Sequence, residues 1–172
     1  RACARAGPGN DRSVRAPTRD KSPENGHRSM TIASLARRSP DPVTPSDSVW
    51  EAASRMKMAD ASAILVVDDG GVVGIVTEQD IVRRVAALGA DPTTTCVADA
   101  MSQPVESIDE DVAVAFADAL MNEQSHRHLV VLDSAGEPVG ILDGNDVLRR
   151  RAEVLEEDVR SLERLAEAEP GG

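Results

Sequence analysis

One stretch of this sequence occurs twice, as Gly74-Ile75-Val76-Thr77-Glu78-Gln79-Asp80-Ile81-Val82-Arg83-Arg84 and as Gly140-Ile141-Leu142-Asp143-Gly144-Asn145-Asp146-Val147-Leu148-Arg149-Arg150. Each copy begins with glycine, carries an aspartate near its middle and ends on two arginines. Upstream the match continues at a constant offset, as in Ile32 with Val97. Self-similarity at a fixed period indicates a duplicated structural unit. The sequence therefore predicts two units related by a pseudo-twofold axis.

Each unit is expected to have a β-α-β-β-α order. Amphipathic spacing predicts helices, apolar runs predict buried strands, and Asp-Asp-Gly-Gly predicts a tight hairpin. The sequence thus predicts a mixed α/β fold of the α+β class, with both units in one module. The expected elements of the first unit are a helical turn at 31–36, a strand at 42–44, a helix at 47–58, strands at 64–67 and 72–76, and a helix at 78–88. Those of the second unit are a turn at 97–101, a strand at 104–107, a helix at 111–123, strands at 128–132 and 137–142, and a final helix that continues beyond the repeat.

Composition divides the chain into five segments. The first 29 residues are rich in Pro, Gly, Ser and Arg and lack Leu, Ile and Phe. They cannot bury enough apolar surface to fold, so we expect a disordered basic tail. The segments are this tail at 1–29, a first repeat at 31–88, a linker at 89–95, a second repeat at 96–151 and a C-terminal helical extension at 152–172.

The charge is acidic and unevenly distributed. Of the net charge of −11, residues 1–29 contribute +4 (seven Arg or Lys against three Asp or Glu), which leaves −15 for residues 30–172. An acidic body repels phosphate backbones. Aromatic residues make up 1% of the chain, so few side chains can stack on bases. We therefore expect no direct nucleic-acid partner.

The sequence predicts neither a membrane segment nor export. No run approaches the ~18 apolar residues of a membrane span, and residues 1–29 lack the apolar centre of a secretory signal. Cys3 and Cys96 show no metal-ligand spacing, and no disulfide framework can be read from them. We expect a cytoplasmic protein without a membrane partner.

The duplicated units resemble a tandem pair of cystathionine β-synthase (CBS) domains, also called a Bateman module. The resemblance rests on the Val-rich strands, the hairpin turns and the Gly-apolar-x-x-x-x-Asp pattern at the last strand-to-helix junction, and it covers residues 31–151. It implies a disc-shaped module with two clefts that hold adenosine derivatives such as AMP, ADP, ATP or S-adenosylmethionine. It also implies a regulatory role without a catalytic cofactor, a homodimer, and a regulated protein as a further partner.

The first repeat fits the family's ligand signature at Gly74, Thr77 and Asp80. The resemblance implies that Thr77 offers its hydroxyl to phosphate and that Asp80 binds the ribose hydroxyls. Gly74 would let the backbone approach the ligand. Thr-x-x-Asp at a helix start also forms a capping box without any ligand, so both interpretations stay open. Family position alone assigns the adenine contacts to Val43, Thr44, Ile64 and Leu65.

The second repeat departs from this signature. It keeps Gly140 and Asp146, but Asp143 stands where the family has Thr or Ser. A carboxylate at this helix start caps the helix and repels phosphate, so we expect this second, degenerate site to be empty or to take a less charged adenosyl ligand. Two histidines alone are a weak metal signal, and we expect no metal site. Basic residues stand before the core strand, where some family members contact phosphates, and these are His126, Arg127 and His128.

The final helix carries leucines seven residues apart, at Leu148, Leu155 and Leu162, with small apolar residues between them. Two to three heptads do not establish a coiled coil. The pattern fits a helix that packs on its own domain, and it equally fits a dimer contact.

Function follows from the resemblance and from what the sequence lacks. The leading prediction is a non-catalytic sensor that binds an adenosine-containing ligand between the repeats. The alternative is a structural module for dimerisation or partner interaction that does not bind nucleotide. An enzyme would need a nucleophile with a base, paired carboxylates or a metal cluster in a pocket. The sequence has no such Ser-His-Asp elbow, phosphate-loop lysine or zinc pattern, so we expect no catalysis.

Overall fold

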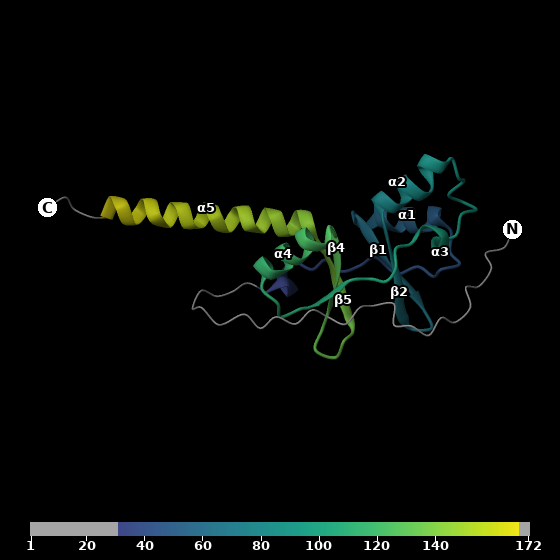
Figure 1. Cartoon of the computed structure of the whole chain (residues 1–172), viewed down its shortest axis with the longest axis horizontal. Coiled ribbons are helices and arrows are strands. Elements are labelled where there is room, and N and C mark those ends of the chain that lie inside the picture. The colour runs from purple at the N-terminus through teal and green to yellow at the C-terminus, as the bar shows by residue number, and fades with distance from the viewer. Residues whose placement is uncertain (1–30, 169–172) are drawn as a thin grey trace.

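The computed structural model describes residues 31–168, and the predicted tail at 1–29 lies outside them. Two lobes lie side by side, and a long helix projects from the second lobe (Figure 1). The elements of the first repeat are the 3-10 helix η1 (Ile32–Ser34), α1 (Val49–Ala59), β1 (Ala63–Asp68), β2 (Gly71–Thr77), α2 (Glu78–Arg84) and the 3-10 helix η2 (Ala86–Leu88). Those of the second repeat are α3 (Val97–Ala100), β3 (Ser107–Asp109), α4 (Val114–Gln124), β4 (His128–Leu132), β5 (Pro138–Asp143) and α5 (Gly144–Ala168).

Each lobe is built on one antiparallel hairpin. β1 pairs with β2 and β4 with β5, and the register shifts at equivalent places, after Val66 and after Val131. β3 joins β4 in parallel, and the equivalent Val43 forms a parallel bridge to Val66. The strand expected at 42–44 is thus a single bridge, and the one expected at 104–107 is displaced to β3. The mixed fold with two repeats and a C-terminal helix is confirmed.

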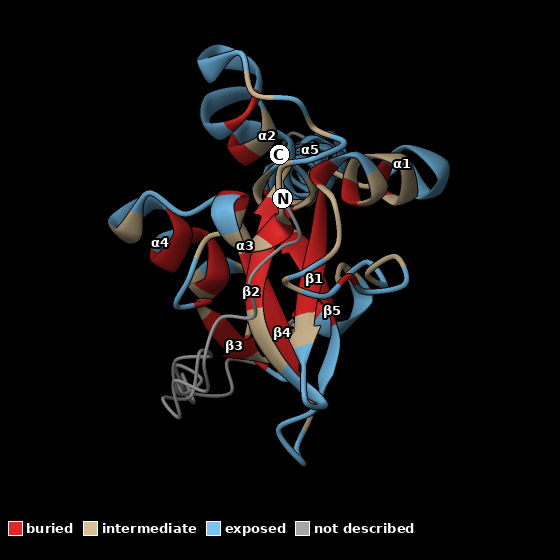
Figure 2. Cartoon of the chain, turned by 90° about the vertical axis from the view of Figure 1, so that its right-hand side faces the viewer, coloured by how far each residue is buried: buried red, intermediate tan, exposed pale blue. Residues whose placement is uncertain are grey.

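Three layers of apolar side chains form the core. Because side chains alternate along a strand, Ile64 and Val66 face α1, whereas Leu65 between them faces the other lobe. The two hairpins therefore pack face to face, with helices on their outer sides. Figure 2 shows the buried residues concentrated in these strands and on the inner sides of the helices. The layer between the lobes consists of Ala63, Leu65, Ile75, Val105, Val130, Leu132 and Ile141.

Helix capping and backbone pairing with neighbouring segments decide where the helices begin and end. The Ser48 hydroxyl accepts a hydrogen bond from the amide of Glu51, so α1 begins two residues later than expected. The helix expected at 78–88 ends at Arg84, and η2 follows it. The helix expected at 111–123 begins only at Val114, because the backbone just before it pairs with η1.

The first turn of each repeat packs on the other repeat. Ile32 is fully buried in the core of the second lobe, and its amide donates to the carbonyl oxygen of Val112. Reciprocally, Val97 is fully buried in the core of the first lobe. A sequence repeat is therefore not a structural lobe, since the two repeats exchange their N-terminal segments.

Two antiparallel bridges fix the exchanged segments along the hairpins. The backbone of Arg37 exchanges two hydrogen bonds with Ile141, at 2.8 and 2.9 Å. The equivalent pair, Ser102 and Ile75, does the same at 2.8 and 3.1 Å. Each exchanged segment therefore ends beside the strand that precedes a motif aspartate, which is β5 before Asp146 and β2 before Asp80.

The motif glycines lie where these segments cross. A Cβ at Gly140 would lie 2.6 Å from the carbonyl oxygen of Arg37, and one at Gly74 would lie 2.6 Å from the Met101 sulfur. Atoms at that separation overlap, so both positions admit only glycine unless a neighbour moves. The glycines of the motif therefore admit the exchanged segment, a role that we did not expect from the sequence.

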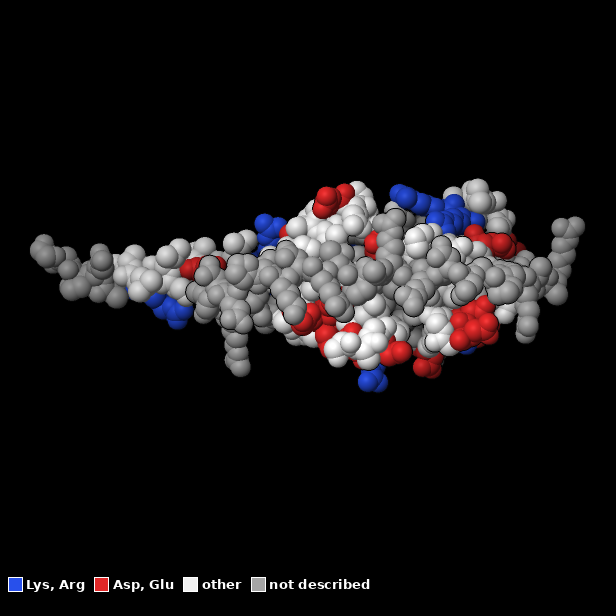
Figure 3. All heavy atoms as spheres, turned by 60° about the horizontal axis from the view of Figure 1, so that its bottom comes forward, with Lys and Arg blue, Asp and Glu red and all other residues white. Residues whose placement is uncertain are grey.

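The C-terminal helix leaves the body. Residues 151–167 are exposed throughout, and Figure 1 shows α5 extending away from both lobes. The interpretation that this helix packs back on its own domain is therefore wrong for its outer part. Within 31–168, no helix combines the length and the apolar character that crossing a membrane requires. On the face drawn in Figure 3, acidic and basic side chains are interspersed.

Candidate ligand-binding clefts

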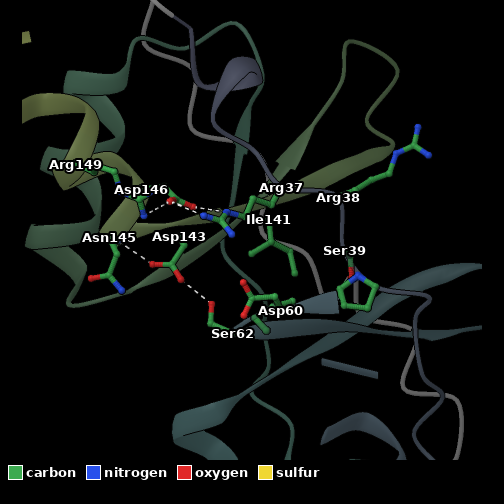
Figure 4. Close-up of a pocket in the computed structure, with 13 residues that line it drawn as sticks. Arg37, Arg38, Ser39, Asp60, Ser62, Ile141, Asp143, Asn145, Asp146 and Arg149 are labelled. Atoms are coloured by element: carbon green, nitrogen blue, oxygen red, sulfur yellow. Dashed lines mark hydrogen bonds and ion pairs between the residues drawn. The ribbon is translucent and has the colours of Figure 1, made fainter. Parts of the chain in front are cut away.

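A cleft opens between the lobes at the start of α5 (Figure 4). Its walls are the exchanged segment at 37–40, the turn at 60–63 before β1, and the junction of β5 with α5. Its cavity volume is about 150 Å³, below the ~300 Å³ at which small-molecule pockets begin. Its charged side chains are Arg37, Arg38, Asp60, Asp143, Asp146 and Arg149.

Two arginines engage Asp146 in this cleft. Nε and Nη2 of Arg37 donate to the two carboxylate oxygens at 2.7 and 3.0 Å, and Arg149 donates at 2.8 Å. Figure 4 shows Arg37 pointing at Asp146 while Arg38 points away. The hydrogen bond to Asp146 also raises the pKa of Arg37. A ligand hydroxyl that reached this carboxylate would have to displace a bidentate, charge-assisted contact.

Asp143 connects the two lobes. Its Oδ2 accepts a hydrogen bond from the Ser62 hydroxyl at 2.6 Å and lies 3.4 Å from Nε2 of His128. Its Oδ1 accepts from the amide of Asn145 at 2.8 Å, so it caps the start of α5. The hydrogen bond from His128, aided by the one from Ser62, holds the pKa of Asp143 well below its usual range, against the opposing effect of burial.

This depressed pKa predicts a specific acid sensitivity. Ionised Asp143 stabilises the fold at pH values above the unfolded-state pKa of about 3.9, and this contribution is lost as the pH falls toward the lower folded-state pKa. We expect the stability difference between the wild type and Asp143→Asn to shrink as the pH falls below about pH 4. Urea unfolding at a series of pH values measures it. A difference that stays constant down to about pH 2 would contradict the assignment.

Ser62, His128 and Asp143 do not form a catalytic triad. In a triad, one histidine nitrogen takes the serine proton and the other contacts the acid. Here the same Nε2 lies 3.0 Å from the Ser62 oxygen and 3.4 Å from the carboxylate, and the hydroxyl donates directly to Asp143. The cluster therefore clamps the lobes and does not activate a nucleophile. Within residues 31–168, no three His, Cys, Asp or Glu side chains are arranged to hold a metal ion.

Asp80, the pseudo-twofold equivalent of Asp146, is engaged mainly by neutral donors. Its Oδ2 accepts from the amide and the hydroxyl of Thr77 at 3.0 and 2.7 Å, and its own amide donates back to that hydroxyl. This reciprocal pair is a complete capping box at the start of α2. Its Oδ1 accepts from the Ser102 hydroxyl at 3.0 Å and lies 3.6 Å from Arg84.

Most candidate adenine contacts lie in the core. Val43, Ile64 and Leu65 expose only 1%, 0% and 6% of their surfaces. Contact between an adenine ring and these three side chains would require the core to open. Thr44 is exposed, and its amide donates to the carboxylate of Asp47 at 2.7 Å.

The candidate basic residues of the second repeat have different settings. The Arg127 carbonyl accepts from the amide of Gly144 at 2.8 Å, while its side chain is exposed. His126 is exposed and lies 3.2 Å from the Gln124 side-chain oxygen, whereas His128 is half-buried beside Asp143. Only His128 of these three therefore contacts the degenerate motif through its side chain.

Sequence reasoning missed the residues that the exchanged segments bring to the motif. Arg37 and Ser102 stand at equivalent positions of the two repeats and contact Asp146 and Asp80, respectively. Their equivalence could be read from the repeat offset. Their place beside the motif aspartates could not, because it depends on which lobe each segment joins.

Comparison with known proteins agrees with this architecture. The CBS domain model matches residues 32–87 and 97–153, which is more than half of the chain. The uncharacterized protein MK0525 of Methanopyrus kandleri is 32% identical over 123 residues, which cover 71% of this chain and 63% of that protein. The chain thus spans less than two thirds of that relative.

Solved structures show the same fold. A CBS-domain protein from Burkholderia ambifaria is 31% identical with a TM-score of 0.64, covering 70% of this chain and 93% of that one. The CBS-domain protein ATU1752 from Agrobacterium tumefaciens is 29% identical with a TM-score of 0.61, covering 70% and 98%. None of these matches indicates an enzyme family. With both repeats matched by the family model, the chain belongs to the CBS domain family.

Proposed function

We propose that this protein is a cytoplasmic, non-catalytic sensor that binds AMP, ADP, ATP or S-adenosylmethionine between the repeats, at Thr77 and Asp80. The observation that carries the proposal is the hydroxyl of Ser102 on the Asp80 carboxylate, at 3.0 Å. A ribose hydroxyl can replace the serine hydroxyl there and keep the same type and number of hydrogen bonds. Binding at this buried carboxylate therefore needs the Ser102 hydroxyl to turn aside but loses no hydrogen bond.

The same exchange is more costly in the second cleft. There the carboxylate of Asp146 is held by the bidentate Arg37 and by Arg149. A bidentate guanidinium joins two N–H donors and an opposite charge to the carboxylate, whereas a hydroxyl contributes one neutral donor. Although the open cleft lies at Asp146, the hydrogen bonds thus favour Asp80 as the ribose site. An open cleft provides room for a ligand, but affinity depends on the contacts that the ligand must break and make.

The phosphate groups of the ligand would be met by the other repeat. Ser62 reaches from the turn before β1 to Asp143 at the start of α5. The pseudo-twofold axis relates Ser62 to Arg127 and Asp143 to Thr77. Because the Ser62 side chain contacts Asp143, the same symmetry directs the Arg127 side chain toward Thr77. Arginine binds phosphate through paired N–H donors. We infer that Arg127, with His126 beside it, supplies the positive charge of this cleft.

Thermal unfolding with added ligand tests the proposal. We expect one of the adenosyl ligands to raise the melting temperature of the wild type, because a ligand at 100 times its dissociation constant stabilises by about 2.7 kcal/mol. The shift should disappear in Asp80→Ala. It should persist in Asp146→Ala, the matched variant in the other cleft. Each shift is measured against the melting temperature of the same variant without ligand.

A further variant separates ribose from phosphate recognition. Arg127→Ser introduces the residue that the first repeat has at the equivalent position. We expect it to weaken AMP, ADP and ATP binding while leaving adenosine binding unchanged. If no ligand shifts the melting temperature, Thr77 and Asp80 serve only as a helix cap. If Asp146→Ala rather than Asp80→Ala abolishes the shift, the second cleft is the site.

A second candidate function is an interaction module that binds no nucleotide. It is favoured by the observation that both motif aspartates are already engaged within the chain. Large apolar side chains are also exposed on α1 and α2, with Trp50 at 58%, Met58 at 89% and Val82 at 60%. Self-association occurs in one protein with this fold, a hexameric CBS-CP12 protein from cyanobacteria (23% identity, TM-score 0.64). Homodimerisation without any ligand-induced shift would support this candidate.

A further inference from the structure

The outer part of α5 carries an uncovered apolar stripe. Leu148, Leu155 and Leu162 expose 56%, 57% and 66% of their surfaces. These leucines lie on one side of a helix that Figure 1 shows extending away from both lobes. A contiguous exposed apolar surface of this kind marks an interaction site. The stripe is therefore the surface of this chain most in need of a partner.

The stripe has the spacing of a coiled-coil seam. Alternate steps of four and three residues lead through Leu148, Ala152, Leu155, Val159, Leu162 and Ala166. In heptad terms, leucine occupies every d position, and alanine or valine occupies every a position. Such a narrow seam fits one facing helix, whereas a helix that packs on a domain core presents a wider apolar face.

The charges beside the seam distinguish the orientations of two such helices. In a parallel pair, each g residue faces an e residue of the partner's next heptad. Arg151 would then face Glu156 of the partner subunit, which is favourable. Asp158 would face Glu163 of the partner subunit, which places two like charges together. The parallel arrangement is therefore only half complementary.

An antiparallel pair can be fully complementary. Positions e then face e, and positions g face g. When Ala152 packs on the partner subunit's Leu155, Arg149 lies beside the partner subunit's Glu156, and Arg151 beside the partner subunit's Asp158. Leu148 then packs on the partner subunit's Val159, so the apolar pairing covers residues 148–159 and leaves Leu162 outside it. The twofold axis makes each opposite-charge pair occur twice. Sliding the partner helix by one heptad toward one end places Arg149 and Arg151 each against its own copy. Sliding it toward the other end places Glu156 and Asp158 each against its own copy, so both alternative registers bring like charges together.

The two arginines are positioned for this role. Arg149 donates to Asp146 at 2.8 Å and Arg151 donates to Asp118 at 2.6 Å. Their side chains are nevertheless 62% and 61% exposed. A guanidinium has five N–H donors, so each can hold its own carboxylate and reach a second one. The intrachain contacts thus orient the basic end of the seam.

We propose that residues 148–159 of α5 form an antiparallel two-helix coiled coil with the same residues of a second copy of this chain, with Ala152 facing the partner subunit's Leu155. The occupant is a second copy because the complementary charges, basic at 149–151 and acidic at 156–158, lie on the same helix. The pairing shares Arg149 with the second cleft but uses no residue of the proposed ligand site at Thr77 and Asp80, so it stands or falls independently of ligand binding there.

Sedimentation equilibrium of the full chain tests this pairing. We expect Leu155→Arg to halve the mass of the wild-type assembly, and because Leu155 is exposed within one chain, the fold should be retained. Asp158→Arg should weaken association by about tenfold, because opposite charges become like charges at two places. Glu157→Arg makes the same charge change on the outer side of the helix and should leave association unchanged.

The sign of the Asp158→Arg effect decides the orientation. In a parallel pair the new arginine would face Glu163 of the partner subunit and strengthen association. Tighter association of this variant would therefore overturn the antiparallel arrangement. A wild type that stays monomeric at about 100 μM, some hundredfold above a micromolar dissociation constant, would overturn the pairing itself. An assembly whose mass Leu155→Arg does not change would overturn it as well.

Discussion

Replacing Ile32 with alanine is expected to lower the free energy of unfolding by about 2 to 5 kcal/mol, the usual cost of this truncation in a packed core. The side chain is fully buried among residues of the second lobe, including Ile108 and Leu129. Urea denaturation measures the loss. Ser34→Ala, an exposed position of the same segment, serves as the control and should change stability by less than about 0.5 kcal/mol.

The location of the damage is as informative as its size. Ile32 belongs to the first repeat in sequence but to the second lobe in space. Hydrogen exchange of Ile32→Ala should therefore show lost protection in β4 and β5 before β1 and β2. If each repeat instead folded as its own lobe, the loss would appear first in β1 and β2. That result would overturn the exchange of N-terminal segments.

The exchange marks the limit of what the sequence could predict about the fold. Local signals placed the hairpins well, since β4 lies at His128–Leu132 as expected and β1 begins one residue before Ile64. These signals depend on neighbours in sequence. The choice of lobe for the segment of Ile32 depends on which of two similar cores it enters, and the two cores offer nearly the same apolar pattern. No single-residue preference distinguishes them.

A similar limit applies to the candidate clefts. The motif pattern identified Thr77 and Asp80, and the structure forms the capping box that the same pattern allows. The partners of the motif carboxylates are distant in sequence. Arg37 lies 109 residues from Asp146, and Ser102 lies 22 residues from Asp80. They could be predicted only once the crossing of the segments was known. Glycine in the motif was the one local signal of that crossing.

Replacing Gly140 with alanine is expected to destabilise the protein by about 1 to 3 kcal/mol, the usual cost of overpacking. The new Cβ would lie 2.6 Å from the carbonyl oxygen of Arg37 and 3.2 Å from its carbonyl carbon. Both atoms are backbone held by hydrogen bonds to Ile141, so the clash can be relieved only by moving the exchanged segment. Thermal and urea unfolding measure the effect.

Gly74→Ala is the matched control, because the pseudo-twofold axis places it in the equivalent crossing. There the atom at 2.6 Å is the Met101 sulfur, part of a flexible side chain that can rotate away. We expect this variant to lose clearly less stability than Gly140→Ala. Equal losses would mean that Met101 is as immobile as backbone.

Because Arg37 belongs to the segment that crosses at Gly140, only Gly140→Ala should also separate Arg37 from Asp146. That change would open the second cleft to a ribose hydroxyl. A ligand-induced shift larger in Gly140→Ala than in the wild type, and reduced to the wild-type size in Gly140→Ala/Asp146→Ala, would show that the arginine had been occupying the site.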